Sequence, residues 1–188
     1  SDTLTAPAAI IDGREIRGRE LLEVIDPYRS TTLGTVESAD AGTVADAVTS
    51  ATAAQREWAA VPVTERSAVL RRTADLFEQN GTRIADTVTA EMGMPSALAV
   101  ATQQVMPAAV LRAMADAAER LDWETDTDGA LLRRVPAGVI AAVTPWNMPV
   151  HQIVAKVSAA FAAGCSVVLK PSEMTPFDAV LAREMFIA

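Results

Sequence analysis

Two short polar segments in the last third of the chain have residue types that could do chemistry, and the first is Thr144-Pro145-Trp146-Asn147-Met148-Pro149. It joins an apolar run to a segment with helical spacing, so the simplest interpretation is a proline-stiffened turn in which Asn147 caps the helix. The alternative is catalytic, because a rigid loop that points one amide into a cavity lets Asn147 donate a hydrogen bond to a developing oxyanion. Pro145 and Pro149 would then hold the amide without loop mobility. Alone, this segment leaves both interpretations open.

The second segment, Lys170-Pro171-Ser172-Glu173, follows a run of apolar residues. Its two charged side chains could simply be solvated at the end of a strand. In a functional interpretation, a carboxylate such as Glu173 accepts hydrogen bonds from both hydroxyls of a ribose. Lys170 would bind the same sugar or offset a nearby phosphate charge. These four residues alone indicate little, and it is the pairing of the two segments that favours function.

The elements around these segments explain how they would meet. Residues 138–144 form a continuous apolar run, which we expect to be a strand buried on both faces. Apolar residues then recur at helical spacing over 150–161, and 166–170 reads as a second buried strand. Loops this short fit a right-handed βαβ crossover, which places both polar segments at the carboxyl ends of parallel strands. The 22 residues between Asn147 and Lys170 leave room for one such crossover.

Upstream, short strands precede helices. Asp12-Gly13 is the expected tight turn of a hairpin over 10–16, and strands are predicted over 21–25 and 33–36. The first predicted helix runs from Asp40 to Pro62, and its apolar face consists of Val44, Ala47, Val48, Ala51, Ala54 and Trp58. The second runs from a Thr64 cap to Asn80-Gly81, and the third covers 82–92 and stops at Gly93. A fourth helix is predicted over 95–121, and a last one follows the cap and first proline at Thr175-Pro176. The inward face of the helix over 95–121 is predicted to be Met106, Val110, Ala113, Met114, Ala117 and Leu121, with a kink or the true start at Pro107.

Together the two polar segments resemble the NAD(P)-dependent aldehyde dehydrogenase superfamily. Its members carry a Pro-Trp-Asn-x-Pro loop and a later Gly-x-x-Val-Val-Leu-Lys-Pro-Ser-Glu strand, which stand here as residues 145–149 and 164–173. The resemblance covers nearly the whole chain as an N-terminal portion. Its upstream matches are Ile11-Asp12-Gly13, Ile25-Asp26-Pro27, Glu65-Arg66, Glu91-Met92-Gly93 and Pro136-Ala137-Gly138-Val139. Met94 departs from the pattern, since many members have lysine there, and we expect it to lie in a surface region.

This resemblance implies an α/β fold: the N-terminal part of an aldehyde-dehydrogenase-like architecture with a Rossmann-type parallel sheet (βαβ at 138–170), preceded by a helical segment and short β-hairpins. It divides the chain into N-terminal hairpins and helices over 1–120, an oligomerisation-type β segment over 121–135, and the truncated start of an NAD(P)-binding Rossmann-like domain over 136–188. The full-length protein is expected to be a homodimer or homotetramer.

The same resemblance makes Asn147 the catalytic donor of the oxyanion hole. The residues that it places against the cofactor are Val143, Thr144, Pro145, Trp146, Asn147, Lys170, Ser172 and Glu173. Glu173 favours NAD, because its charge would repel the 2′-phosphate of NADP, the alternative cofactor. The implied substrate is a small-molecule aldehyde, which the full-length enzyme oxidises to a carboxylic acid through a thiohemiacetal.

The lone cysteine and the lone histidine are not expected to be catalytic. Cys165 begins a buried strand without a neighbouring base or cation to lower its pKa, so we interpret it as structural. His151 lies one turn into a helix and is interpreted as a surface or packing residue. By the resemblance, the nucleophilic cysteine and the glutamate base belong to later motifs that this chain lacks. The chain alone should therefore not complete a turnover.

Composition excludes several partners. The net charge is −8 without clusters of Lys or Arg, which argues against nucleic acid and against an anionic membrane surface. The start of the chain lacks the pattern of a signal peptide, and no apolar run is long enough to span a membrane. One cysteine fits a reducing compartment, so we expect a cytoplasmic protein. With one histidine, a multi-histidine metal site is impossible, and no metal is predicted.

Three interpretations of the chain stay open. It is a fragment of a full-length oxidoreductase, a truncated non-catalytic protein that binds a nucleotide or a partner, or one half of a split enzyme whose cysteine comes from a second chain. We favour the first, because the helical pattern over 177–188 shows no cap.

Overall fold

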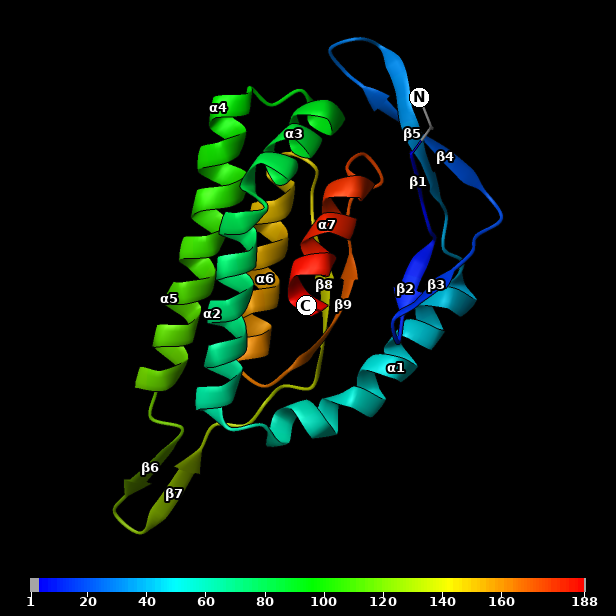
Figure 1. The fold of residues 1–188 in the computed structure, drawn as a ribbon. Helices are drawn as coiled ribbons and strands as arrows, with labels where there is room; N and C mark the ends of the chain where they lie inside the picture. Colours follow the sequence, from blue (N-terminus) through cyan, green and yellow to red (C-terminus); the bar gives the residue numbers. More distant parts are fainter. Residues whose placement is uncertain (1–3, 188) are drawn as a thin grey trace.

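The computed structural model describes residues 4–187 and begins with five short strands. Their bounds are β1 (Leu4–Ala6), β2 (Ala9–Ile11), β3 (Arg14–Ile16), β4 (Leu21–Asp26) and β5 (Thr31–Glu37). β2 and β3 form an antiparallel hairpin, and β5 lies between β1, which is parallel to it, and β4, which is antiparallel. The predicted hairpin at Asp12-Gly13 and the strands over 21–25 and 33–36 are confirmed. In Figure 1 these strands lie to the right of α2, α5 and α6 and above α1.

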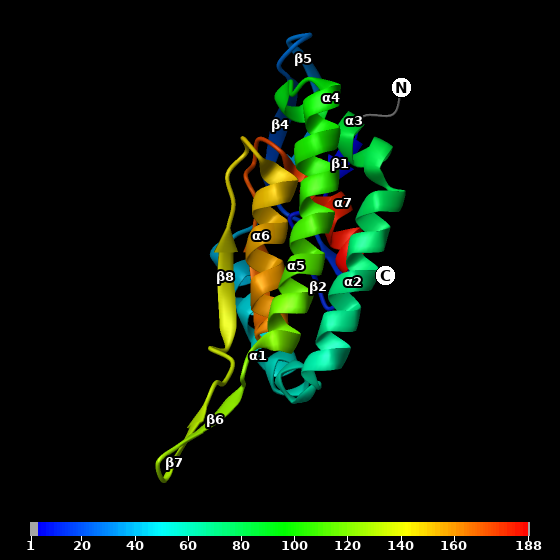
Figure 2. The same ribbon diagram turned by 90° about the vertical axis from the view of Figure 1, so that its left-hand side faces the viewer.

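Helices dominate the rest of the chain. They are α1 (Ala41–Ala60), α2 (Val63–Gln79), α3 (Gly81–Met92), α4 (Ser96–Ala99), the π-helical turn η1 (Val100–Val105), α5 (Met106–Arg120), α6 (Pro149–Ala162) and α7 (Pro176–Ile187). α2, α5 and α6 pack side by side, and α7 packs against α2, α3 and α6 (Figures 1 and 2). The main core lies between these helices, and its largest fully buried apolar side chains are Phe77, Leu70, Ile84, Leu111 and Ile153.

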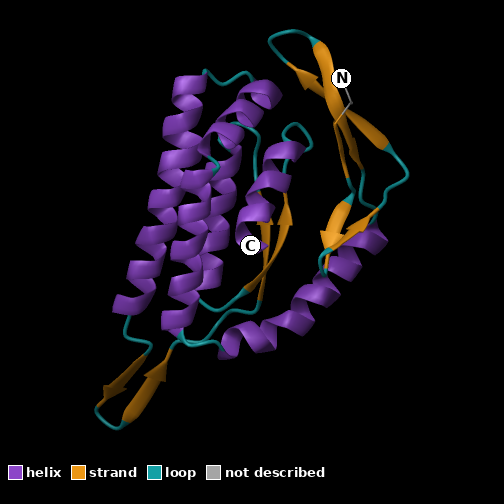
Figure 3. Cartoon of the chain, in the orientation of Figure 1, coloured by secondary structure: helices purple, strands orange, loops and turns teal. Residues whose placement is uncertain are grey.

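The predicted βαβ unit is confirmed. β8 (Val139–Val143) and β9 (Ser166–Lys170) are parallel neighbours, and α6 connects them, as Figure 3 shows for the orange strands behind the purple helices. α6 buries the face that its spacing predicts, with Val150, Ile153, Val154 and Val157 inward. The helix ends before Gly164, whose φ of +79° is a left-handed conformation that side chains with a Cβ rarely adopt. This turn sends the chain directly into β9.

The prediction that residues 138–144 are buried on both faces is wrong. Burial alternates along β8: Ala142 is buried, whereas Ala141 is exposed and Val143 is 64% exposed. The cause is that β8 and β9 form a two-stranded sheet within residues 4–187, and the connecting helix α6 packs on one of its faces. Figure 2 shows β8 at the edge of the molecule with the helices on one side of it.

The predicted helix over 95–121 is confirmed with a π-helical turn inside it, and most of its predicted inward face is wrong. α4, η1 and α5 follow one another without a gap, and the residues at their junctions, Ala99, Val100, Val105 and Met106, are all in the right-handed helical conformation, so Pro107 does not mark the true start. The residues that α5 buries are Pro107, Ala108, Leu111, Ala115 and Ala118. Of the predicted face, Val110 and Met114 are half-buried against the core, and Met106, Ala113, Ala117 and Leu121 are exposed. Small alanines face inward because α5 packs closely on α2 and α6, which leaves the larger side chains at the margin of the contact.

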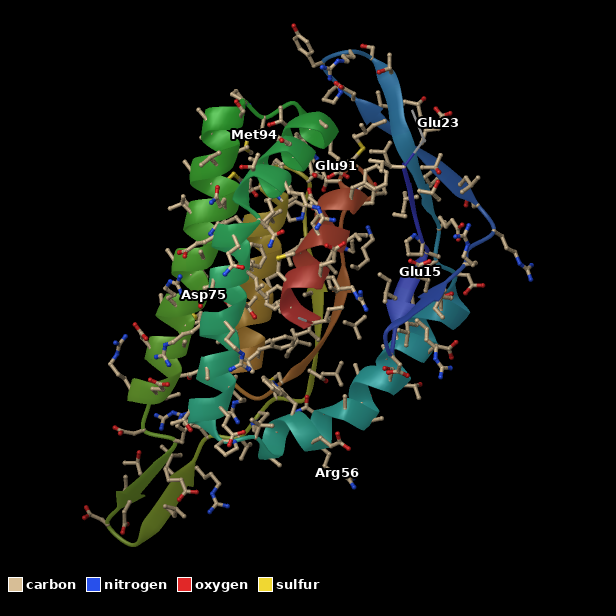
Figure 4. All side chains as sticks on the ribbon, in the orientation of Figure 1. Glu15, Glu23, Arg56, Asp75, Glu91 and Met94 are labelled. Atoms are coloured by element: carbon tan, nitrogen blue, oxygen red, sulfur yellow. The ribbon has the colours of Figure 1, made fainter. Side chains whose placement is uncertain are left out.

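Met94 was expected in a surface region, but it is buried, with 5% of its surface exposed. α3 ends at Gly93, as predicted, with φ +74°, and the turn folds the next residue back under η1. There the Met94 sulfur contacts the Thr102 hydroxyl oxygen at 3.4 Å. Figure 4 labels Met94 near the α4 end of the helical layer.

The predicted side-chain caps of two helices are wrong: Thr64 does not cap α2, and the Thr175 hydroxyl, which has no hydrogen-bond partner within residues 4–187, does not cap α7. α2 begins at Val63 and Pro62 precedes it, so Thr64 lies in the first turn and is not the cap. The Pro62 carbonyl accepts hydrogen bonds from the backbone N–H groups of Glu65 and Arg66, so the residue before α2 satisfies two amides of its first turn. α7 begins at Pro176, as predicted. Its next two amides, however, donate to the carboxylate of Glu91 on α3, which stands beside the start of α7 in Figure 4.

The α1 helix has no fully buried residue. Part of its predicted apolar face, including Ala51 and Trp58, lines an open apolar groove of about 650 Å³ that β2, β9 and α7 also border. Val44 and Val48 of that face are exposed instead. α1 is anchored by the Gln55 side chain, which donates to the Gly164 carbonyl at 2.9 Å and accepts the Ser166 amide.

The remaining strands, β6 (Glu124–Thr127) and β7 (Ala130–Arg133), form an antiparallel hairpin. It projects from the body of the protein at the end opposite α4, as both ribbon views show (Figures 1 and 2). Leu131 and Leu132 are more than half exposed on it. Within residues 4–187, no helix combines the length and the apolar character that crossing a membrane requires.

Candidate functional site

The two polar segments predicted to act together start side by side. Val143 and Lys170 are register partners at the carboxyl ends of β8 and β9. One residue later, the Thr144 amide donates to the Lys170 carbonyl at 3.2 Å, which extends the pairing beyond the strands. This edge of a parallel sheet is where ligands bind in open α/β folds.

The loop after β8 holds Asn147 at the surface. Thr144 is buried, Pro145 and Asn147 are exposed, and Trp146 is half exposed. Met148, not Asn147, occupies the N-cap position of α6, and no side chain caps the helix from that position. The interpretation of Asn147 as a helix cap is therefore wrong, and its amide stays available to a ligand.

The segment after β9 carries a pair of opposite charges. Lys170 Nζ and Glu173 Oε2 are 3.3 Å apart, and both side chains are largely exposed. The Glu173 pKa lies below its ordinary value, because its own backbone amide and then the Lys170 ammonium stabilise the carboxylate. Glu173 is consequently ionised at neutral pH and accepts hydrogen bonds only.

Ser172 has a different place from its neighbours. It is buried, and its hydroxyl accepts the Met174 amide at 3.2 Å, so this side chain fixes the turn between β9 and α7. The apolar groove beside α1 reaches the same edge of the sheet at Leu169 and Pro171. The exposed surface thus combines an apolar strip, a free amide and a charged pair. That donor set fits a nucleotide, whose sugar hydroxyls pair with carboxylates and whose base and ring carbons prefer apolar cover.

Cys165 and His151 lie where the sequence predicts. Cys165 is 3% exposed and directly precedes β9, so a whole strand separates it from Lys170. His151 is half-buried in the first turn of α6. Neither meets the exposed edge formed by Asn147 and Glu173.

Sequence reasoning missed two buried polar side chains near this edge. Gln103 on η1 accepts the His151 amide at 3.1 Å, and Glu91 on α3 accepts the first amides of α7. The only available signal was a polar residue inside a helical pattern, which usually indicates a solvated face. Contacts across 48 and 86 residues of chain leave no local pattern.

Comparison with known proteins agrees with this fold. The model of the aldehyde dehydrogenase family matches residues 14–188. Mouse mitochondrial succinate-semialdehyde dehydrogenase is 36% identical over 94% of this chain, and a putative aldehyde dehydrogenase of Staphylococcus aureus is 35% identical over 92%. These alignments take up 35% and 36% of the relatives, so the chain spans about a third of their length.

Solved structures give the same result. Aldehyde dehydrogenase C of Pseudomonas syringae, a mutant in complex with NAD+ and octanal, superposes with a TM-score of 0.93 at 34% identity over 96% of this chain and 38% of that one. Lactaldehyde dehydrogenase of Escherichia coli superposes with a TM-score of 0.91 at 28% identity over 98% of this chain and 40% of that one. The expected α/β fold, with its parallel βαβ unit, is confirmed. Because the family model also covers almost every residue, the chain belongs to the aldehyde dehydrogenase family.

Proposed function

We propose that this chain supplies the oxyanion-hole donor and part of the NAD(P) site of an enzyme that oxidises an aldehyde to a carboxylic acid. The observation that carries the proposal is the edge where β8 and β9 end. There the exposed amide of Asn147 follows a strand whose partner leads into the Lys170–Glu173 ion pair. The hydrogen bond from Thr144 to Lys170 holds the two loops together.

Each side chain has a role that its surroundings support. Asn147 would donate its amide hydrogen to the oxygen that becomes negative when a nucleophile attacks the aldehyde. Glu173, ionised and exposed, would accept the ribose hydroxyls, and Lys170 would donate to the same sugar. Val143, Thr144, Pro145 and Trp146 would line the cofactor, while Ser172 would hold the turn that carries Glu173. A bound NAD+ supplies the hydride acceptor.

The thiolate that forms the thiohemiacetal is assigned to sequence outside these 188 residues. The one thiol present, Cys165, is buried before β9 and separated from the exposed edge by that strand. A buried thiol without access to an aldehyde cannot act as a nucleophile. The resemblance to aldehyde dehydrogenases likewise assigns the glutamate base to sequence outside these residues.

The proposal extends to the organisation of the whole protein. Residues 1–120 and 136–188 are assigned to the N-terminal segment and to the start of the cofactor domain. The β6–β7 hairpin within 121–135 would join subunits of a homodimer or homotetramer, because it projects from the body and exposes Leu131 and Leu132. A free thiol fits a reducing compartment, which supports a cytoplasmic location.

Calorimetry on the 188-residue chain tests the nucleotide site. We expect heat on titration with NAD, and a Kd about tenfold higher for Glu173→Gln, because a charged acceptor for ribose hydroxyls is lost. Glu173→Gln should also lower the ratio of the Kd for NADP to the Kd for NAD. Glu65→Gln, which alters an exposed carboxylate on α2, is the matched control. A folded chain that binds neither nucleotide would refute the site, and an unchanged Kd for E173Q would refute the ribose assignment.

Steady-state kinetics test the role of Asn147, using the longest expressed form of the protein. Asn147→Ala should lower kcat by about 10²- to 10³-fold, the usual cost of one oxyanion-hole donor. The Kd for NAD should stay unchanged, since the ribose contacts are assigned to the other loop. Wild-type turnover by N147A would remove Asn147 from the mechanism.

A further inference from the structure

We propose that Gln103, a glutamine on the π-helical turn η1, is a positioning residue for Asn147. Its side chain is completely buried and binds the residues that immediately follow Asn147 in the chain. The proposal rests on the oxyanion role of Asn147 and names the group that fixes the direction of its amide. Gln103 does not touch the exposed edge itself and acts only through the loop.

Three hydrogen bonds define the orientation of the Gln103 amide. Its Oε1 accepts the backbone N–H of His151 at 3.1 Å, in the first turn of α6. Its Nε2 donates to the Met148 sulfur at 3.3 Å and to the Thr102 hydroxyl at 3.0 Å. A flipped amide would set its NH₂ group against the His151 N–H, so only one orientation satisfies all partners. Gln103 therefore binds the junction between the loop and α6 at two residues, Met148 and His151.

The start of α6 needs this external acceptor. Met148 stands at the N-cap position with φ −147° and ψ 58°, and it has no side-chain oxygen to accept an amide of the first turn. Pro149 has no N–H, which leaves the next amides of the helix as the groups to be satisfied. Gln103 supplies from another element the acceptor that an N-cap residue normally provides.

The π-helical turn explains how Gln103 reaches this position. Among the residues of η1, Gln103 is the only buried one. An extra residue per turn rotates the helix that follows, and such turns often occur at functional sites. Thr102 keeps the turn in place, since its hydroxyl donates to the Leu98 carbonyl at 2.7 Å and contacts the Met94 sulfur. The contacts form a continuous connection from buried Met94 through Thr102 and Gln103 to Met148.

These contacts also constrain the position of Asn147. It precedes Met148 directly, and it is exposed, so the neighbouring chain determines where its amide points. Thr144 is tied to Lys170 at the other end of the loop. With both ends fixed and Pro145 and Pro149 inside the span, the loop has few free dihedrals left. Removal of the Gln103 amide releases one end only.

NMR on the 188-residue chain gives the first test, because Trp146 lies in the loop and Trp58 and Trp123 lie elsewhere. Gln103→Met keeps the size of the side chain and removes its hydrogen bonds. We expect the Trp146 indole and Asn147 amide signals to shift or broaden, while the other two indole signals stay in place. Gln104→Met is the matched control, since Gln104 belongs to the same turn but donates to Glu78 on α2 at 3.3 Å. Unchanged loop signals in Q103M, or equal shifts at all three indoles, would overturn the proposal.

A double-mutant cycle in the longest expressed form of the protein gives the second test. Q103M should lower kcat about tenfold, the size expected for losing a helix-capping contact, without changing the Kd for NAD. In an Asn147→Ala background the same change should cost less than about twofold, because the group that it positions is gone. A purely structural role predicts the same loss in both backgrounds, and that result would overturn the proposal.

The two tests separate failure of this proposal from failure of the proposed function. If N147A retains full activity, the function assigned to Asn147 fails, and the positioning role of Gln103 in that function fails with it, whatever the NMR signals show. If N147A is impaired but Q103M shows no coupling to it, only the positioning role fails. If Q103M does not fold, Met148→Leu can replace it, because this change removes only the sulfur acceptor of Gln103. Its effect on kcat should also depend on the presence of Asn147, but should be smaller than that of Q103M.

Discussion

Replacing Glu91 by glutamine should remove about 3 kcal/mol of the pH dependence of stability between about pH 4.5 and 8. Glu91 and Asp178 are both buried, and Glu91 accepts the amides of Phe177 and Asp178 at 2.6 and 2.9 Å. Burial raises the pKa of Glu91 to about 7. Burial, and then the nearby charge of Glu91, raise the pKa of Asp178 well above its usual range. Figure 4 labels Glu91 at the junction of α3 and α7.

The sign follows from where the proton is bound. A carboxyl whose pKa rises on folding binds its proton more tightly in the native state, so its contribution to stability is complete below the unfolded pKa of 4.5 and is lost as pH rises through 7. At about 1.4 kcal/mol per pKa unit, Glu91 accounts for a loss of about 3 kcal/mol over this range. Asp178 acts in the same direction, since its pKa is raised as well.

Urea unfolding of the 188-residue chain at a series of pH values measures this loss. The free energy of unfolding of the wild type should fall by at least about 3 kcal/mol from pH 4.5 to 8, and that of Glu91→Gln should fall by about 3 kcal/mol less, because only the share of buried Asp178 remains. The two curves should cross, because the glutamine keeps one acceptor for α7 and avoids the cost of a buried charge at high pH. Asp86→Asn, at an exposed position of α3, is the control and should follow the wild type. Parallel curves for wild type and E91Q would refute the reasoning.

Three other predictions concern packing and the lone thiol. Leu111→Ala should lower the free energy of unfolding in urea by about 2–5 kcal/mol and Met106→Ala by less than about 1 kcal/mol, because Leu111 is buried and Met106 is exposed. Equal losses for the two variants would support the helix face predicted from sequence. Gln55→Leu should cost about 2 kcal/mol and speed hydrogen exchange at the Ser166 amide, since the hydrogen bonds from α1 to Gly164 and to Ser166 at the start of β9 are lost. Cys165 should react with a thiol reagent only after unfolding, and Cys165→Ala should leave the heat of NAD binding unchanged; rapid labelling of the native chain would contradict its burial.

The βαβ unit could be predicted because its signals are local. Apolar runs, a helical period and Gly164 at the helix end together fix β8, α6 and β9, and parallel pairing then brings Val143 next to Lys170. The prediction of a doubly buried β8 failed because the residues that cover a strand are far away in sequence. An apolar run shows that a strand can be buried, and it does not show how many neighbours are present.

The inward face of α5 could not be predicted for a related reason. Periodicity assigns the larger apolar residues to the core, and Met106 and Leu121 meet that criterion. In the structure a π-helical turn precedes α5, and close packing on α2 selects alanines such as Ala115 for the contact. Neither the extra residue of the turn nor the distance between two helices has a sequence signature in one chain. Met94 was misplaced in the same region, by the same turn.

The capping of α6 and α7 shows what sequence reasoning about domains leaves out. Both helices belong to the segment over 136–188 and begin with a proline, and at least one first-turn amide of each is accepted by a side chain from the segment over 1–120. Gln103 serves α6 and Glu91 serves α7. A helix start that is satisfied only by a distant element is not stable before that element is in place. The proposed boundary at 121–135 therefore separates stretches of sequence that should unfold as one cooperative unit, and the loop that carries Asn147 depends on both.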